Sequence, residues 1–169
     1  MIRRVVEKRM AAVYEIDGRL LVRTVNSCGG AGIEADAITV LDGFPDLEAR
    51  QLGQAVQAAL IQCREIPMPR TWPSTPEYAR PFLELSPRRY RSYRAWQRAA
   101  RYAFVTASAE SIRAERRFPD LGRGAWGPMP ASPADRAWTD DVAMAPAAPA
   151  DILGNALLTV LAAPPLRGP

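Results

Sequence analysis

Apolar side chains in residues 46–64 recur with the spacing of a helix that buries one face. They occupy the i, i+3, i+4, i+7, i+8 positions of such a helix and are Leu52, Ala55, Val56, Ala59, Leu60 and Cys63. Asp46 follows a proline and is predicted to cap the first amides. Glu48 in the first turn and Arg64 in the last would both oppose the helix dipole.

The same apolar pattern returns near the C-terminus, shifted by 101 residues (52 to 153, 60 to 161). The repeated positions are Leu153, Ala156, Leu157, Val160 and Leu161. Leu52-Gly53-x-Ala55 is matched by Leu153-Gly154-x-Ala156, and Asp151 is the predicted cap of the second helix. The sequence therefore predicts two similar helices that pack on the elements between and before them.

Strand patterns precede the first helix. Residues 12–16 and 19–25 favour β-structure and flank Asp17-Gly18, the strongest short signal for a two-residue hairpin. Residues 28–32 are glycine-rich and predict a flexible loop, and residues 37–41 predict a third strand.

Prolines change the pattern after the first helix. Pro67, Pro69, Pro73, Pro76 and Pro81 predict that residues 65–85, with Trp72 among them, form an irregular surface excursion. Ser86-Pro87 then offers a cap followed by a proline at a first helical position, so a helix is expected from there to about Arg101.

The second half of the chain repeats the order of strands followed by a helix. Residues 102–107 and 111–118 predict paired strands, the second with its arginines facing water. Residues 120–133 are predicted as loop, 134–139 as a short strand, 142–149 as a linker and 164–169 as a frayed tail.

These elements predict an α+β fold in which amphipathic helices cover a largely antiparallel mixed sheet. A weak internal two-fold repeat, strands and then a Leu-Gly-x-Ala helix, accompanies it. With 169 residues and 48% apolar content, residues 1–169 are expected to form a single globular domain. We find no run of 18 apolar residues and no export signal, so a cytoplasmic location is expected.

Residue content argues against most catalytic and metal chemistry. The chain has no histidine, which removes histidine-based triads and metal sites, and its two cysteines cannot form a zinc site alone. Cys63 lies on the apolar stripe and is predicted to be a small buried hydrophobe, whereas a bridge to Cys28 stays open. The adjacent Asp140 and Asp141 are predicted to be solvated, with no metal bound.

Other signatures are weak. Gly29-Gly30-Ala31-Gly32 lacks the third glycine of a dinucleotide-binding loop, since position 35 is Ala35, and is predicted to connect two strands. The only lysine, Lys8, lacks the paired carboxylates of a metal-dependent nuclease core. We therefore predict a protein that is not an enzyme and has no cofactor.

Positive charge is concentrated in one block. Residues 88–123 carry ten basic and three acidic side chains, whereas the flanking parts are slightly acidic. Within residues 86–102 arginine alternates with tyrosine and tryptophan. Three interpretations stay open: an amphipathic helix with core aromatics, a surface for a protein partner, and a module that binds single-stranded nucleic acid through residues 88–102.

Five segments share a pattern with a known family. They are Val22 to Ser27, Gly29 to Glu34, the Leu52-Gly53-x-Ala55 helix through Cys63-Arg64, Ser92-Tyr93-x-x-Trp96 and the closing Leu153-Gly154-x-Ala156-Leu157 helix. Together they resemble the cytosolic immunity proteins of bacterial contact-dependent growth inhibition systems. The resemblance implies a non-enzymatic protein that binds the C-terminal toxin domain of a secreted effector, often a nuclease acting on tRNA. It carries over no contact residues.

The resemblance leads us to expect a one-to-one complex with a toxin domain, and neither a membrane nor a small-molecule substrate as partner. Arginine, tyrosine and tryptophan dominate protein-binding hot spots. The predicted contact residues are Trp72, Arg88, Arg89, Tyr90, Arg91, Arg94, Arg123 and Trp126. A basic nuclease would instead be met by acidic residues such as Asp135, Asp140 and Asp141.

Overall fold

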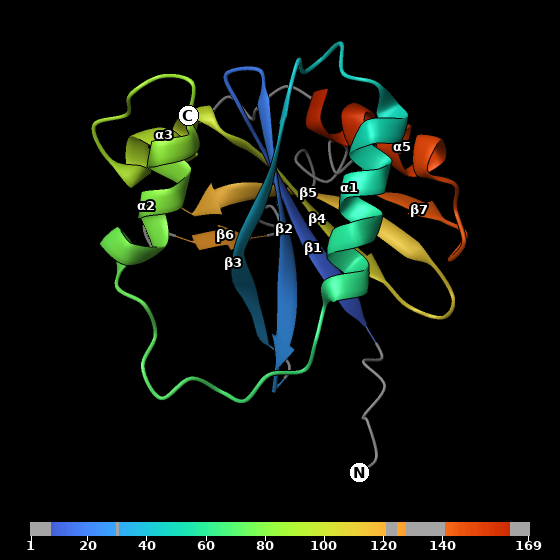
Figure 1. The fold of residues 1–169 in the computed structure, drawn as a ribbon, viewed down its shortest axis with the longest axis horizontal. Helices are drawn as coiled ribbons and strands as arrows, with labels where there is room; N and C mark the ends of the chain where they lie inside the picture. The colour runs from blue at the N-terminus through green and yellow to red at the C-terminus, as the bar shows by residue number, and fades with distance from the viewer. Residues whose placement is uncertain (1–7, 30, 121–124, 128–140, 163–169) are drawn as a thin grey trace, which may run out of the picture.

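The computed structural model describes residues 8–29, 31–120, 125–127 and 141–162 (Figure 1). The elements follow one another as β1 (Arg9–Ile16), β2 (Arg19–Cys28), β3 (Ala31–Asp42), α1 (Ala49–Gln62), α2 (Thr75–Leu85), α3 (Tyr93–Ala99), β4 (Arg101–Ala107), β5 (Ile112–Asp120), β6 (Ala125–Gly127), β7 (Val142–Met144) and α5 (Ala150–Ala162).

The strands form one antiparallel sheet in the order β3-β2-β1-β4-β5-β6, with β7 also paired to β5. The predicted hairpin around Asp17-Gly18 is confirmed, since Ile16 pairs with Arg19. The predicted pairing of the two central strands of the second half is confirmed as well, because β4 pairs with β5. The α+β fold with an antiparallel sheet is therefore as the sequence predicts.

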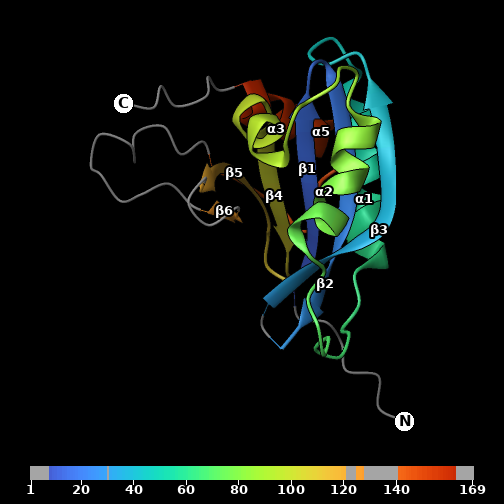
Figure 2. The ribbon, with the colours of Figure 1, turned by 90° about the vertical axis from the view of Figure 1, so that its left-hand side faces the viewer.

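Helices cover both faces of this sheet, α1 and α5 on one and α2 and α3 on the other (Figure 1). Successive side chains of β1 point to opposite faces of the sheet and so contribute to the two core layers in turn. Ala11 and Val13 face α1 and α5, whereas Tyr14 and Ile16 face the aromatic layer under α2 and α3. Figure 2 looks onto that second face. None of the helices in the described ranges is long and apolar enough to cross a membrane.

The repeated Leu-Gly motifs meet in a symmetric helix pair. The buried residues of α1 are Leu52, Gly53, Val56, Ala59 and Leu60, and those of α5 are Leu153, Gly154, Leu157, Val160 and Leu161. Each buried residue of α1 corresponds to the buried residue of α5 that lies 101 positions later in the sequence.

The two glycines sit where the helix backbones touch. A Cβ added to Gly53 would lie 1.7 Å from the carbonyl oxygen of Ala150, and one added to Gly154 would lie 1.7 Å from that of Ala49. Ala49 and Ala150 are themselves related by the same offset of 101. Both helices therefore use the same residues to approach each other, and only glycine fits at the crossing.

The second layer is an aromatic cluster. The Tyr14 ring stacks on Tyr102 with centroids 4.4 Å apart, and the Phe82 ring lies 4.8 Å from Trp96. Trp96 is completely buried, and Tyr93 is 7% exposed. Most aromatic side chains of the arginine-rich block therefore belong to the core. This agrees with the interpretation of the block as an amphipathic helix with core aromatics.

The predicted irregular excursion over residues 65–85 is wrong in its second half, which forms α2. Ser74 and Glu77 make a capping box at its start, and Pro76 lies in the first turn, where a missing N–H costs nothing. Pro81 stands inside the helix. Because Phe82 is completely buried in the aromatic cluster, packing offsets the hydrogen bond that Pro81 cannot make.

The helix predicted from Ser86 to Arg101 is shorter, since α3 begins at Tyr93. Ser92 is its N-cap, and its Oγ accepts a hydrogen bond of 3.2 Å from the Ala95 N–H. Ser86 instead ends α2. Its hydroxyl donates to the Phe82 carbonyl at 2.6 Å and accepts from Trp96 Nε1 at 2.8 Å, which ties the two helices together.

The predicted ends of the two long helices are also wrong. α1 starts after Glu48, which makes no side-chain cap, and stops at Gln62, so Asp46 and Arg64 both lie outside it. Asp151 lies within the first turn of α5, where its charge still complements the dipole.

The β-structure is more extensive than predicted. Cys28 ends β2 and pairs with Ala31 at the start of β3, so Cys28, Ala31 and Gly32 of the flexible loop expected over residues 28–32 belong to strands. The expected linker over residues 142–149 contains β7. The predicted strand 134–139 and the predicted tail 164–169 lie outside the described residues. Most of the predicted loop 120–133 lies outside them as well, and its described residues 125–127 form β6.

One arginine of β5 points inward, contrary to the prediction that all face water. Arg116 is 4% exposed and donates through Nη1 to the Val160 carbonyl at 3.3 Å and the Leu161 carbonyl at 3.1 Å. These carbonyls belong to the last turn of α5, which has no basic residue of its own. A sheet arginine therefore caps this helix.

Candidate functional site

Five arginines of the segment between residues 88 and 98 form a positively charged part of the described surface. We call them the arginine surface: Arg88, Arg89, Arg91, Arg94 and Arg98. All five side chains are exposed. Arg88 makes an ion pair of 3.2 Å with Asp17, and the other four make none with a described carboxylate. The surface thus carries positive charge that the described chain leaves uncompensated.

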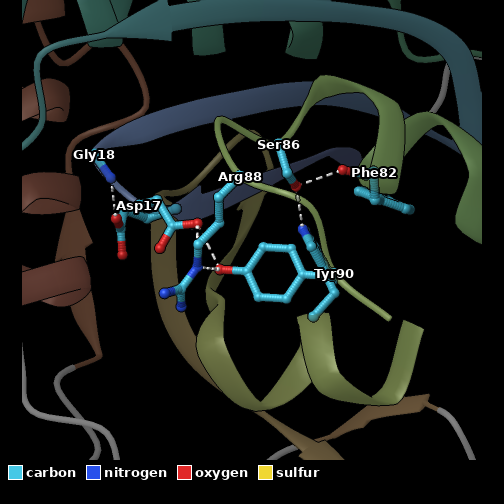
Figure 3. A network of polar contacts seen from close by, with 8 residues as sticks. Asp17, Gly18, Phe82, Ser86, Arg88 and Tyr90 are labelled. Carbon is cyan, nitrogen blue, oxygen red and sulfur yellow. Dashed lines mark hydrogen bonds and ion pairs between the residues drawn. The ribbon is translucent and has the colours of Figure 1, made fainter. Parts of the chain in front are cut away.

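A polar network holds this segment against the β1–β2 turn (Figure 3). The Tyr90 hydroxyl donates to Asp17 Oδ2 at 2.5 Å and accepts from Arg88 Nε at 3.0 Å. Partial burial, and then the Asp17 carboxylate, raise the pKa of Tyr90, so it stays a hydroxyl donor at neutral pH. Tyr90 therefore anchors the connection between α2 and α3 while the neighbouring arginines point to solvent.

The structure brings together five of the eight predicted contact residues: Arg88, Arg89, Tyr90, Arg91 and Arg94. Arg98 belongs to the same surface, although the prediction omitted it from the same arginine-rich block. Trp72 lies elsewhere, at the other end of α2. Trp126 lies in β6, whose backbone pairs with Pro119 of β5, and Arg123 lies outside the described residues.

The burial of the block's aromatics affects the nucleic-acid interpretation. Tyr93, Trp96 and Tyr102 are 7%, 0% and 7% exposed and pack in the core. These rings are therefore closed to base stacking, which single-strand binders combine with phosphate contacts. The exposed arginines of the block could still contact phosphates, so this is the part of the nucleic-acid interpretation that the structure leaves possible.

A cavity of about 490 Å³ lies at the N-terminal end of α2, and we call it the Trp72 cavity. Its walls come from α2 and the segment before it, from β2 and β3, and from β4 and β5. The lining residues are Trp72, Pro73, Glu77, Tyr78, Pro81, Arg23, Val25, Gly32, Ile33, Glu34, Asp36, Tyr102, Phe104 and Arg117. The arginine surface follows the C-terminal end of α2, whereas α2 contributes Glu77, Tyr78 and Pro81 to the cavity, so the two features lie toward opposite ends of this helix.

A buried ion pair forms the floor of the Trp72 cavity. Arg23 Nη1 lies 2.8 Å from Glu34 Oε2, and the two side chains are 4% and 10% exposed. Arg23 also donates to the Ala35 carbonyl from Nε at 2.9 Å and from Nη2 at 2.6 Å, and Tyr14 donates its hydroxyl to Glu34. Burial raises the pKa of Glu34 above its ordinary value, although Arg23 opposes the shift. The charges of Arg23 and Glu34 at the floor of the cavity therefore compensate each other.

Elsewhere, Cys28 and Cys63 are free and buried, and Cys63 behaves as the buried small residue that its position predicts. In the ranges that the structure describes, no group of three or more acidic or cysteine side chains could hold a metal ion. Asp141 is partly exposed and lies 3.4 Å from Arg113, while Asp135 and Asp140 are outside these ranges.

Comparison with known proteins gives a likeness in fold. The sequence matches no protein-family model and no curated protein. The fold is similar to a solved protein of unknown function, NMB0488 from Neisseria meningitidis, with a TM-score of 0.69 and 15% identity over 95% of this chain and 98% of that one.

It is also similar to a chain of the CdiA-CT/CdiI toxin and immunity complex from Yersinia pseudotuberculosis. That match has a TM-score of 0.67 and 16% identity, and it covers 92% of this chain and 96% of the other. At such identities the likeness concerns the fold, which is shared over nearly the whole length of both chains.

Proposed function

We propose that this protein is an immunity protein that binds the C-terminal toxin domain of a contact-dependent growth inhibition effector and neutralises it in the cytoplasm. The chain acts as a one-to-one binding partner and makes or breaks no bonds. The likeness in fold to a chain of a toxin and immunity complex supports this role. So does the absence of histidine, the commonest general acid and base, from the whole sequence.

The observation that carries the proposal is the arginine surface. Four exposed guanidinium groups without an ion pair to a described carboxylate give this surface a local positive potential, which attracts an acidic partner. Arginine binds carboxylates in a forked, two-bond geometry and is enriched in binding hot spots. In this proposal Arg88, Arg89, Arg91 and Arg94 contact the toxin, as do Trp72, Arg123 and Trp126.

We further propose that the toxin is a nuclease, and that its substrate is tRNA. A nuclease binds phosphates through a cationic groove, whereas its remaining surface can be acidic. The arginine surface then binds away from that groove.

Reversing charge on the arginine surface tests the proposal. The proposal places the gene of the toxin domain directly upstream of this one. The Arg89→Glu/Arg94→Glu variant is expected to bind that domain about 10- to 100-fold more weakly, mostly through slower association. Surface plasmon resonance at two salt concentrations measures this. The matched control, Arg50→Glu/Arg64→Glu, reverses two exposed arginines at the ends of α1 and is expected to bind within about threefold of the unchanged protein.

Co-expression in bacteria supplies the functional readout. Cells that produce the toxin domain are expected to grow only when the unchanged protein or the control is present. If cells die as readily with the unchanged protein as without it, the proposed role is wrong.

The same arginines also favour a second candidate, binding to the phosphates of a single-stranded nucleic acid. This function predicts an affinity for RNA that falls steeply with salt and that the Arg89→Glu/Arg94→Glu variant loses. A filter-binding titration with a single-stranded RNA at low salt tests it, and the absence of binding excludes it.

A further inference from the structure

We infer that the Trp72 cavity receives a cationic side chain, arginine or lysine, that the toxin domain presents. This inference rests on the proposed function and adds a second contact to the arginine surface. The arginine surface is positively charged and follows the C-terminal end of α2, whereas the cavity lies toward the N-terminal end of α2 and would attract a positive charge.

The charges around the cavity leave a negative excess. The Arg23 guanidinium is compensated by Glu34 at 2.8 Å, and that of Arg117 is compensated by Glu115 at 2.7 Å. Asp36 is exposed and makes no ion pair with a described residue. The cavity mouth therefore presents an uncompensated carboxylate.

Glu77 adds a second carboxylate from the α2 side of the cavity. It accepts hydrogen bonds from the N–H and the hydroxyl of Ser74, both at 2.8 Å. These bonds, and to a smaller extent the nearby charge of Arg80, lower the pKa of Glu77, so it is ionised at neutral pH while Arg80 offsets part of its charge. A cation entering between β3 and α2 meets negative charge on both walls.

Aromatic walls provide the other half of a cation site. The Trp72 side chain is 57% exposed at the cavity edge, although an indole of that size is among the side chains that gain most from burial. Tyr78, Tyr102 and Phe104 line the interior. The chain already places guanidinium groups on such rings, since Arg23 lies 5.1 Å from the Phe82 centroid and Arg117 lies 5.1 Å from that of Phe104.

Other occupants fit less well. An anion would be repelled by Asp36 and Glu77, and an apolar side chain would desolvate these carboxylates without a partner. A guanidinium or ammonium group satisfies them and lies on the Trp72 ring at the same time. A nuclease supplies such groups, because its substrate-binding surface is cationic. Binding here would cover part of that surface.

Two variants test the inference in the complex with the upstream toxin domain. Trp72→Ala removes the exposed ring, and Asp36→Asn removes the exposed charge with little change in shape. Each is expected to raise Kd about 10- to 100-fold in calorimetry, the effect of losing a binding hot spot. Trp72→Phe, which keeps a ring, is expected to restore most of the affinity. Circular dichroism and thermal melting show whether each variant folds as the unchanged chain does.

Matched controls lie away from the cavity. Ile61→Ala shortens another exposed apolar side chain, 70% exposed on α1, and Glu110→Gln neutralises an exposed carboxylate in the β4–β5 turn. Both are expected to leave Kd within about threefold of the unchanged value.

Charge reversal decides the sign of the occupant. Asp36→Arg is expected to weaken binding more than Asp36→Asn, whereas tighter binding would mean an acidic occupant and overturn the inference. If the unchanged protein binds and neither Trp72→Ala nor Asp36→Asn alters Kd, the inference is overturned and the proposed function stands. If the unchanged protein fails to bind the toxin domain, both are overturned.

Discussion

Replacing Gly53 or Gly154 with alanine is expected to destabilise the protein by about 3 kcal/mol or more. The new methyl group would lie 1.7 Å from a backbone carbonyl oxygen of the facing helix in either case. A backbone atom cannot turn aside as a flexible side chain does, so the two helices must separate. Their separation loosens the buried layer of Leu52, Val56, Leu153 and Leu157 on the sheet.

The direction of the stability change distinguishes crowding at the helix crossing from the intrinsic helix propensity of alanine. Helix propensity alone favours alanine over glycine by about 1 kcal/mol, so an uncrowded glycine would give a more stable variant. Urea unfolding followed by tryptophan fluorescence measures the difference. Gln54→Ala and Asn155→Ala are exposed neighbours on the same two helices and are expected to change the free energy of unfolding by less than about 0.5 kcal/mol. A stabilised Gly53→Ala variant would contradict the close approach of α1 and α5.

Replacing Arg23 with methionine is expected to cost about 3–5 kcal/mol at pH 7, because Glu34 is then left buried without its counter-charge. The Ala35 carbonyl loses both of its Arg23 donors as well. The double variant Arg23→Met/Glu34→Gln is expected to recover part of the loss, since no isolated charge remains. Urea unfolding of the four proteins in this cycle measures the coupling.

The loss is expected to depend on pH. Burial holds the pKa of Glu34 above its ordinary value of 4.5, and Arg23 is the main group that lowers it. A carboxyl with a raised pKa in the folded state binds more protons folded than unfolded, so its contribution to stability falls as pH rises from 4.5 through that pKa. Without Arg23 this pKa rises further. The Arg23→Met variant should therefore lose less stability at pH 5 than at pH 7.

The Arg19→Met variant is the matched control. Arg19 pairs with Asp42 at 2.7 Å on the surface, and its hydrogen bond lowers the pKa of Asp42 below 3.8. That contribution is present above 3.8 and disappears only as pH falls through the lowered pKa, so it is equal at pH 7 and pH 5. The ion pair contributes little because water screens it. Arg19 Nη1 also donates to the Leu85 carbonyl at 2.8 Å, and a carbonyl does not titrate, so the loss of that bond is the same at both pH values. A loss for Arg23→Met that is equal at both pH values would contradict the buried state of Glu34.

Prediction from the sequence failed mainly at the proline-rich segment and at helix ends. Pro81 argues against a helix over residues 75–85, and only the buried position of Phe82 on the aromatic layer shows why α2 forms. Arg116 is one of several similar arginines in the sequence, yet it is the buried one that donates to the last carbonyls of α5, where Arg101 also donates to Leu161. Such choices depend on neighbours that are distant along the chain, and no local pattern contains them.

The candidate site divides in the same way. The arginine-rich block is visible in the sequence, and in the structure Arg88, Arg89, Arg91 and Arg94 lie on one exposed surface. The sequence could not separate that surface from the core, because Tyr93 and Trp96 alternate with the arginines and yet are buried. It also gave no reason to place Trp72 beside Asp36 and Glu77, which come from three different segments.

By itself the sequence determined the α+β class, the central hairpins and the repeated Leu-Gly helices, because these follow from the period of apolar residues and from local turn chemistry. Only the tertiary structure decided that the two glycines face each other's helix backbone, which aromatic rings are core, and where charge stays uncompensated. The reason is physical: periodicity encodes which face of an element is buried, whereas contacts and net charge at a surface depend on which elements the fold brings together.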